Sequence, residues 1–152
     1  MAPDHAEAPA FHWPVRVYYE DTDAGGVVYH ARYLHFMERA RTEWLRAIGF
    51  EQTRLRSEHD VLFAVRRMDL QFVSPARFDE ELLVTTRLTG NGRASFDFEQ
   101  QVLRADGHSP CCRATVNVAC LDAGRLRPTR IPHEILNALS ALTANGVTAD
   151  GL

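Results

Sequence analysis

The feature that most constrains the fold is a continuous series of strand-like segments that follows a single long helical segment. Between residues 61 and 122, four stretches alternate apolar and polar side chains, as half-buried strands do. Before them, residues 31–49 carry apolar side chains at three- and four-residue spacing, the period of an amphipathic helix. One helix and one antiparallel meander bury each other only if the sheet curls around the helix. The sequence therefore predicts an α+β domain with a long helix wrapped by a curved antiparallel sheet.

The long helix is expected to begin near Ala31 and to end before Gly49, because glycine readily adopts the left-handed conformation found at helix ends. Its predicted buried face consists of Leu34, Met37, Ala40, Trp44, Leu45 and Ile48.

Strands are predicted over residues 14–19, 61–73, 81–90, 93–104 and 111–122. The dipeptides Asn91-Gly92 and Asp106-Gly107 predict tight hairpin turns between the later strands. A short helix is expected over residues 132–142, and the polar stretch 51–60 is assigned no element.

Length and composition indicate one soluble globular domain. The chain has 152 residues, of which 45% are hydrophobic and 24% charged, and its formal charge of −3 gives no electrostatic argument for nucleic-acid binding. The expected organisation is a flexible tail over residues 1–12, a single domain over 13–142 and a C-terminal tail over 143–152. No transmembrane segment is expected, because no apolar run reaches the about 18 residues needed to span a bilayer.

The three cysteines favour a reducing compartment. Cys111, Cys112 and Cys120 form an odd set with one adjacent pair, which is a poor disulfide framework. They are expected to be small core residues, and the N-terminus lacks the basic and apolar regions of a secretory signal. These features predict a cytoplasmic protein.

Metal-binding patterns fail on spacing. A calcium loop that started at Asp21 would place Gly25 and Arg32 where oxygen ligands are required. His30 and His35 are five residues apart and do not share a helix face, so no zinc pair results. Serine-nucleophile and nucleotide-binding glycine motifs are also absent from the sequence. No metal site is expected.

The remaining candidate chemistry is a carboxylate next to a helix entrance. Asp23 precedes Gly25-Gly26, which let a substrate approach the backbone, and unpaired N–H groups near His30 would polarise a carbonyl. Asp23 would attack that carbonyl or activate water. The competing interpretation is a local turn in which Asp23 bonds its own backbone. Both interpretations stay open at this point, and Glu20 and Asp21 are expected to be structural or electrostatic partners.

The segment WPVRVYYEDTDAGGVVYHARYLHFMERARTEWLR closely resembles the signature of the Tol-Pal-associated acyl-CoA thioesterase (YbgC) family, within the 4-hydroxybenzoyl-CoA thioesterase-like superfamily. The similarity extends more weakly to about residue 130. The resemblance implies a hotdog fold and a homodimer or homotetramer built by edge-to-edge pairing of sheets. It also implies that Asp23 is the catalytic aspartate, that His30 is the motif histidine and that the backbone N–H of His30 polarises the carbonyl.

The resemblance further implies an acyl-CoA substrate, with short-chain or aromatic acyl groups favoured, and no cofactor, since coenzyme A belongs to the substrate. Gly25, Gly26 and Tyr29 are expected to contact the substrate. Arg93 and Ser95 lie where one relative binds the coenzyme A phosphates, although ordinary strand-end residues would look the same.

Two rival functions are a non-catalytic adaptor for an acyl carrier protein or phospholipid-synthesis enzymes, linked to the Tol-Pal envelope system, and a hotdog enoyl-CoA hydratase. Peripheral association with the inner membrane is the alternative to a freely cytoplasmic protein.

Overall fold

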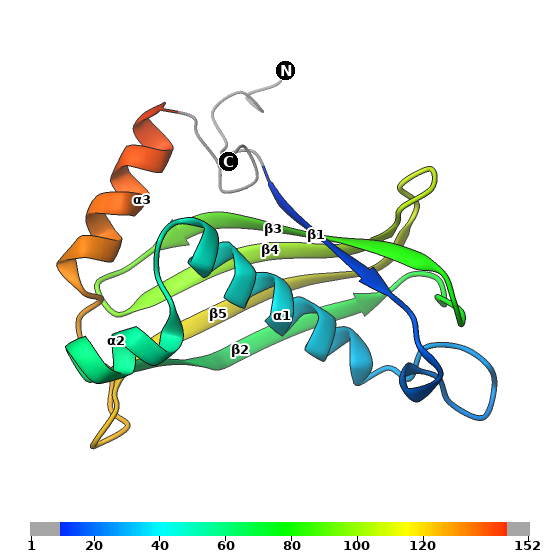
Figure 1. Cartoon of the computed structure of the whole chain (residues 1–152), viewed down its shortest axis with the longest axis horizontal. Coiled ribbons are helices and arrows are strands. Elements are labelled where there is room, and N and C mark those ends of the chain that lie inside the picture. The colour runs from blue at the N-terminus through cyan, green and yellow to red at the C-terminus, as the bar shows by residue number, and fades with distance from the viewer. Residues whose placement is uncertain (1–9, 146–152) are drawn as a thin grey trace.

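The computed structural model describes residues 10–145. Five antiparallel strands form one sheet in the order β1-β3-β4-β5-β2, and the long helix α1 lies across one face of it (Figure 1). The α+β architecture predicted from the sequence is confirmed. The strands are β1 Phe11–Arg16, β2 Val61–Phe72, β3 Glu81–Asn91, β4 Ser95–Arg104 and β5 Pro110–Asp122. The helices are the 3₁₀ helix η2 Tyr19–Asp21 and the α-helices α1 Arg32–Ala47, α2 Gln52–His59 and α3 His133–Asn145.

The sheet is a meander with one added strand at each edge. β3, β4 and β5 follow one another, and the two predicted hairpin turns connect them. Gly92 donates its N–H to the Ser95 carbonyl over 2.9 Å in the first turn, and Gly107 adopts a φ of +82° in the second. β1 then pairs with β3, and β2 pairs with β5. Because β1 precedes α1 and β2 follows it, the helix connects the two edges of the sheet across its face.

Helix α1 packs its apolar face against the sheet. Trp44 meets Phe98 edge to face, with ring centroids 5.0 Å apart and an angle of 85° between the planes. The predicted helix end is confirmed: Gly49 has a φ of +105° and donates its N–H to the Arg46 carbonyl over 3.0 Å. The buried residues of α1 are Tyr33, Phe36, Met37, Ala40, Trp44 and Leu45.

The first turn of α1 differs from the predicted face. Leu34 was expected to be buried but is 37% exposed, whereas Tyr33 and Phe36 are buried. Leucine and tyrosine occupy adjacent positions, and spacing alone does not say which of them faces the sheet. The hydroxyl of Tyr33 accepts a buried hydrogen bond, which makes burial of this ring compatible with its polar end.

A buried polar network connects α1 to the centre of the sheet. Gln100 on β4, which is only 1% exposed, donates from Nε2 to Thr86 Oγ1 over 2.8 Å and to the Met37 carbonyl over 3.0 Å. Its Oε1 accepts a hydrogen bond of 2.8 Å from Arg41, whose pKa is lowered by burial. Since each donor and acceptor of Gln100 has a partner, its amide is tolerated in the core and fixes the helix on the sheet.

Helix α2 was not predicted. Residues 51–60 are polar on almost every side, and Leu55 is the one buried residue of the helix. Apolar periodicity therefore gives no signal for it. The helix ends at Asp60, which takes a left-handed conformation with a φ of +60° and donates its N–H to the Arg56 carbonyl over 3.2 Å.

The first and last elements differ from their predicted limits. The first strand spans Phe11–Arg16, whereas the sequence predicts a strand over 14–19. The last helix continues to Asn145, beyond the predicted end at 142. The remainder of the predicted tails falls in residues 1–9 and 146–152, outside the described residues. Within residues 10–145, no helix has the length and apolar character needed to cross a membrane.

Candidate active site

The loop between η2 and α1 folds as a small antiparallel hairpin. The Tyr29 N–H donates to the Asp21 carbonyl over 2.8 Å, and the Asp23 N–H donates to the Val27 carbonyl over 2.9 Å. Between these two bonds, Thr22 pairs with Val28. These contacts fix residues 21–29, which we call the site loop, and place Asp23 at its turn.

The side chain of Asp23 makes the local turn that the sequence allowed. Its Oδ1 accepts a hydrogen bond of 2.8 Å from the Gly25 N–H, and its carbonyl accepts one of 3.0 Å from the Gly26 N–H. Gly26 has a φ of +83°, where a side chain would be strained. The residue is nevertheless exposed, and its Oδ2 has no hydrogen bond or ion pair within the described part of the chain. The turn and a reactive carboxylate are therefore compatible, since the turn uses one oxygen.

Asp21 has the structural role expected for it. It is 4% exposed, and its Oδ2 accepts a hydrogen bond of 2.9 Å from the Tyr18 N–H. Its Oδ1 lies 3.7 Å from Nε of Arg32 in the first turn of α1. The buried carboxylate thus holds η2 against the start of the helix. Glu20 beside it is exposed.

The entrance of α1 provides backbone donors. Ala31, which caps the helix, has no side-chain hydrogen bond to the first turn. The N–H of His30 has no acceptor among residues 10–145. Unpaired N–H groups at the start of a 16-residue helix carry a partial positive charge, which favours a developing oxyanion. The ring of His30 is exposed and lies against two aromatic rings, with centroids 4.5 Å from Tyr29 and 6.3 Å from Phe72.

The structure brings some of the expected site residues together and leaves two apart. Asp23, Gly25, Gly26, Tyr29 and His30 share the site loop and the helix entrance, and all are exposed. No direct contact joins the side chains of Asp23 and His30 within the described residues. A substrate would have to bridge them.

Arg93 and Ser95 lie at the other end of the sheet. Ser95 starts β4 and Arg104 ends it, and this strand of 10 residues spans about 30 Å. The Arg104 end is adjacent to the site loop, whereas the carbonyl of Arg93 accepts an N–H from Ile131, just before α3. Figure 1 shows the loop that precedes α1 at the opposite end of the molecule from α3. Within one chain, these two residues are therefore distant from Asp23.

The segment between β2 and β3 supports the site loop, and sequence reasoning missed it. The Val28 N–H donates to the Ala76 carbonyl over 2.9 Å, and Val27 pairs with Arg77. The hydroxyl of Tyr33 in α1 accepts a buried hydrogen bond of 3.1 Å from the Ala76 N–H, and burial raises the pKa of this tyrosine. The sequence predicts only that a strand ends at residue 73, and no local pattern reveals these contacts.

The cysteines are unsuited to nucleophilic chemistry. Cys111, Cys112 and Cys120 are all buried and unpaired, as expected of small core residues. Burial raises the pKa of Cys112 and of Cys120 to about 11, so both thiols are protonated at neutral pH.

The described residues also hold no group of three or more His, Cys, Asp or Glu side chains placed to bind a metal ion. An exposed carboxylate beside free helix amides remains, and this arrangement suits acyl transfer.

Comparisons with known proteins agree with this geometry. A family profile described as the thioesterase-like superfamily matches residues 17–139. The chain is 46% identical over 132 residues to the acyl-CoA thioesterase YbgC of Haemophilus influenzae, which covers 87% of this chain and 96% of that protein. It is 46% identical over 126 residues to the acyl-CoA thioester hydrolase YbgC of Escherichia coli, covering 83% and 92%.

A solved structure of similar sequence has the same fold. The crystal structure of a probable thioesterase from Bartonella henselae superposes with a TM-score of 0.76 at 40% identity, covering 81% of this chain and 99% of that one. The hotdog fold implied by the sequence resemblance is thereby confirmed. The chain belongs to the thioesterase-like superfamily and, within it, to the YbgC family of acyl-CoA thioesterases.

Proposed function

We propose that this protein is an acyl-CoA thioester hydrolase, which converts an acyl-CoA and water into a carboxylic acid and coenzyme A. The observation that carries the proposal is that the site loop and the adjoining helix entrance present the free carboxylate oxygen of Asp23 and the unpaired N–H of His30. The names of the YbgC relatives support the same activity.

In the proposed mechanism, the thioester oxygen accepts the N–H of His30, which stabilises negative charge as the carbonyl carbon becomes tetrahedral. Asp23 acts in one of two ways. As a nucleophile, its Oδ2 forms a bond to the carbonyl carbon and the C–S bond breaks, which gives a mixed anhydride and the coenzyme A thiolate. Water then hydrolyses the anhydride. As a general base, Asp23 removes a proton from water as the water oxygen bonds to the same carbon; the tetrahedral intermediate then collapses, the C–S bond breaks, and the carboxylic acid and the coenzyme A thiolate leave.

The remaining residues of the loop orient the reacting groups. The hydrogen bond from Gly25 holds Oδ1 of Asp23, so that Oδ2 is left for chemistry. Gly26 has no side chain to obstruct a substrate that approaches the backbone. The exposed rings of Tyr29 and His30 flank the helix entrance, and His30 assists by orienting the substrate or protonating the leaving thiolate.

We also propose that the protein works as a homodimer or homotetramer. β2 has 12 residues and pairs on one side with β5, so its other side presents a long edge of unpaired backbone groups. Val65, Phe72 and Val73 on or next to this strand are between 44% and 54% exposed. The ring centroids of Phe72 and His30 are also 6.3 Å apart. A second copy of the protein bound to this edge would therefore lie next to the helix entrance that follows the site loop.

The expected substrates are acyl-CoA thioesters with short-chain or aromatic acyl groups, and no cofactor is required. Arg93 and Ser95 are proposed to contact coenzyme A phosphates from another subunit of the oligomer, because they lie far from Asp23 in their own chain. The proposed setting is the cytoplasm, with peripheral contact with the inner membrane and the Tol-Pal system, and an acyl carrier protein or phospholipid-synthesis enzymes as partners.

A thiol-trapping assay on a small panel of acyl-CoA thioesters tests the activity. The wild-type protein should release free coenzyme A and the acid from at least one of them, and Asp23→Asn should release them at least about 100-fold more slowly. Release that is unaffected by Asp23→Asn would exclude the mechanism. No release from any thioester would favour an adaptor, and addition of water to an enoyl-CoA without free thiol would identify a hydratase.

A further inference from the structure

A single peptide group connects the helix entrance to a partly buried arginine. The peptide between Pro75 and Ala76 donates its N–H to the hydroxyl of Tyr33 in the first turn of α1, over 3.1 Å. Its carbonyl, from Pro75, accepts a hydrogen bond of 2.6 Å from Nη2 of Arg104 at the end of β4. Because a peptide group is a rigid plane, these two bonds couple the position of the arginine to that of the helix.

The next peptide group extends the coupling to the site loop. The carbonyl of Ala76 accepts the N–H of Val28 over 2.9 Å, and Ala76 itself is fully buried. Both the loop that holds Asp23 and the helix turn that follows His30 are therefore bonded to the backbone of one residue. A small rotation of this backbone would change the distance between the carboxylate and the oxyanion donor.

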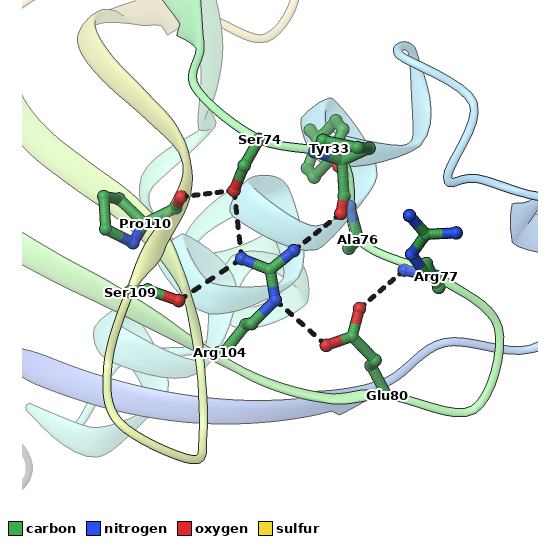
Figure 2. Close-up of polar contacts among 9 residues, drawn as sticks. Tyr33, Ser74, Ala76, Arg77, Glu80, Arg104, Ser109 and Pro110 are labelled. Carbon is green, nitrogen blue, oxygen red and sulfur yellow. Dashed lines mark hydrogen bonds and ion pairs between the residues drawn. The ribbon is translucent and has the colours of Figure 1, made fainter.

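Arg104 also holds both ends of the segment that contains Ala76 (Figure 2). Its Nη1 donates to Ser74 Oγ over 2.9 Å, and its Nε lies 3.0 Å from Oε2 of Glu80. The Arg104 and Glu80 side chains are only 25% and 29% exposed, so solvent screens this ion pair less than one at the surface. A planar guanidinium has N–H donors in fixed directions and can therefore bond to Ser74, Pro75 and Glu80 at once. The ammonium of a lysine could not make the same set of hydrogen bonds.

Further hydrogen bonds hold the partners of Arg104 in place. Ser74 donates from Oγ to the Pro110 carbonyl over 2.8 Å, and Ser109 Oγ lies 3.3 Å from Nη1 of Arg104. The second carboxylate oxygen of Glu80 accepts the N–H of Arg77 over 2.8 Å. Together these contacts hold residues 74–80 against the end of β4 and the start of β5.

We propose that Arg104 is a positioning residue for the thioesterase reaction. It sets the Pro75–Ala76 peptide and, through it, the relative placement of Asp23 and the His30 amide, without touching the substrate. The inference rests on the proposed function, since the geometry it controls is that of the proposed carboxylate and oxyanion donor.

The kinetic test compares Arg104→Gln with Arg87→Gln. The control removes the Arg87–Glu99 ion pair, which lies in the middle of the same sheet and has a partly buried arginine and an exposed glutamate. Arg104→Gln should lower kcat by about 10- to 100-fold with little change in KM, because misplacement of reacting groups by up to 1 Å costs this much. Arg104→Lys should recover part of kcat, because the lysine ammonium can still form an ion pair with Glu80. Arg87→Gln should leave kcat unchanged.

A second readout separates positioning from loss of folded protein and does not need activity. Amide hydrogen exchange at Val28 should become faster in Arg104→Gln, while exchange at Val84 in the buried strand β3 stays as in wild type. Faster exchange at both amides to the same extent would mean general destabilisation, and unchanged exchange at Val28 would mean that the cluster does not hold the loop. Either result overturns the proposal.

These experiments distinguish failure of the proposed thioesterase function from failure of the proposed positioning role of Arg104. If the wild-type protein releases no thiol, the proposed function fails, and the Val28 exchange rate alone decides whether Arg104 positions the loop. If wild type is active and Arg104→Gln retains full kcat in a fully folded sample, the positioning role is wrong and the thioesterase function stands. Tyr33→Phe combined with Arg104→Gln should lower kcat by less than the product of the single effects, because both act on one peptide.

Discussion

Two places in the molecule carry the same tripeptide in the same turn, and their surroundings differ. In Asp23-Ala24-Gly25 and in Asp122-Ala123-Gly124, the glycine N–H donates to Oδ1 of the aspartate over 2.8 Å. A Cβ added to Gly25 would lie 3.3 Å from that oxygen, and one added to Gly124 would lie 3.4 Å from it. The local geometry is therefore matched almost completely, so it cannot be what makes one aspartate a catalytic candidate.

The difference lies in the chain segment after each turn. After Asp122 the chain folds back, and its Oδ1 also accepts the Arg125 N–H over 3.1 Å. Backbone hydrogen bonds from Arg125 and Gly124 lower the pKa of Asp122, and within residues 10–145 the hydrogen bonds that its carboxylate accepts all come from its own loop. After Asp23 the chain enters α1 at an unpaired His30 amide. The reactive unit is therefore the turn together with the helix entrance.

The strongest test of the comparison is the exchange of each aspartate for asparagine. Asn keeps an oxygen that can accept the glycine N–H, so both turns should survive. Asp23→Asn should lower kcat by about 10²- to 10⁴-fold, because a positioned acid–base or nucleophilic group contributes this much. Asp122→Asn should leave kcat within experimental error of wild type in the thiol-release assay. Equal losses in both variants would remove the distinction between the two turns.

Alanine at the two glycines sharpens the comparison. Gly25→Ala forces the Asp23 carboxylate to move by a few tenths of an ångström, and we expect kcat/KM to fall by about tenfold as a result. Gly124→Ala would place its Cβ 3.4 Å from Oδ1 of Asp122, at the limit of ordinary van der Waals contact, and should not change the kinetics. Steady-state assays of both variants, with circular dichroism to verify folding, check this. A loss of activity in Gly124→Ala would show that the effect is not specific to the site loop.

The substitution His30→Ala tests whether the backbone N–H or the imidazole of residue 30 contributes more to kcat. The substitution keeps the N–H and removes the imidazole, so we expect kcat to fall by no more than about tenfold, below the full contribution of a proton-transfer group. A loss as large as that of Asp23→Asn would assign the chemistry to the ring.

The smallest expected effect is on the pH dependence of the free energy of unfolding, through Asp122 in the second of the two turns. Because the folded state lowers the pKa of Asp122, the ionised side chain stabilises the fold above the unfolded pKa of about 3.9, and this contribution disappears as the pH falls through the lower folded value. The free energy of unfolding of wild type should therefore exceed that of Asp122→Asn by a small margin at pH 7. Urea titrations should show this margin shrinking toward pH 3. A margin independent of pH would mean that the charge of Asp122 is not involved.

Much of the fold follows from sequence because its strands alternate regularly and its turns use Asn-Gly and Asp-Gly. Four of the five strands lie within a few residues of their predicted limits, and Gly49 ends α1 as expected. Helix α2 was missed because Leu55 is its one buried residue, which leaves no apolar period to detect. The face of α1 was misjudged at Leu34 because contact with the sheet selects Tyr33 instead.

The candidate site was predictable only along one stretch of chain. Asp23, the glycines and His30 are neighbours in sequence, and the family resemblance singles them out. The supporting contacts join residues far apart: Ala76 bonds to Tyr33 across 43 positions, and Arg104 bonds to Pro75 across 29. No local pattern contains such pairs. A local turn at Asp23 and a catalytic role are alternative interpretations of the sequence, yet in the structure the turn occupies one carboxylate oxygen and leaves the other without a hydrogen bond or ion pair among the described residues.

The central claim is tested most directly by a crystal structure with a ketone analogue of an acyl-CoA, in which a methylene replaces the thioester sulfur. We predict that the ketone oxygen lies about 2.7–3.1 Å from the backbone nitrogen of His30, and the carbonyl carbon about 3–3.5 Å from Oδ2 of Asp23 or from a water bound to it. A ligand whose carbonyl lies beyond reach of both groups, with Asp23 still in its turn as Asp122 is, would contradict the account.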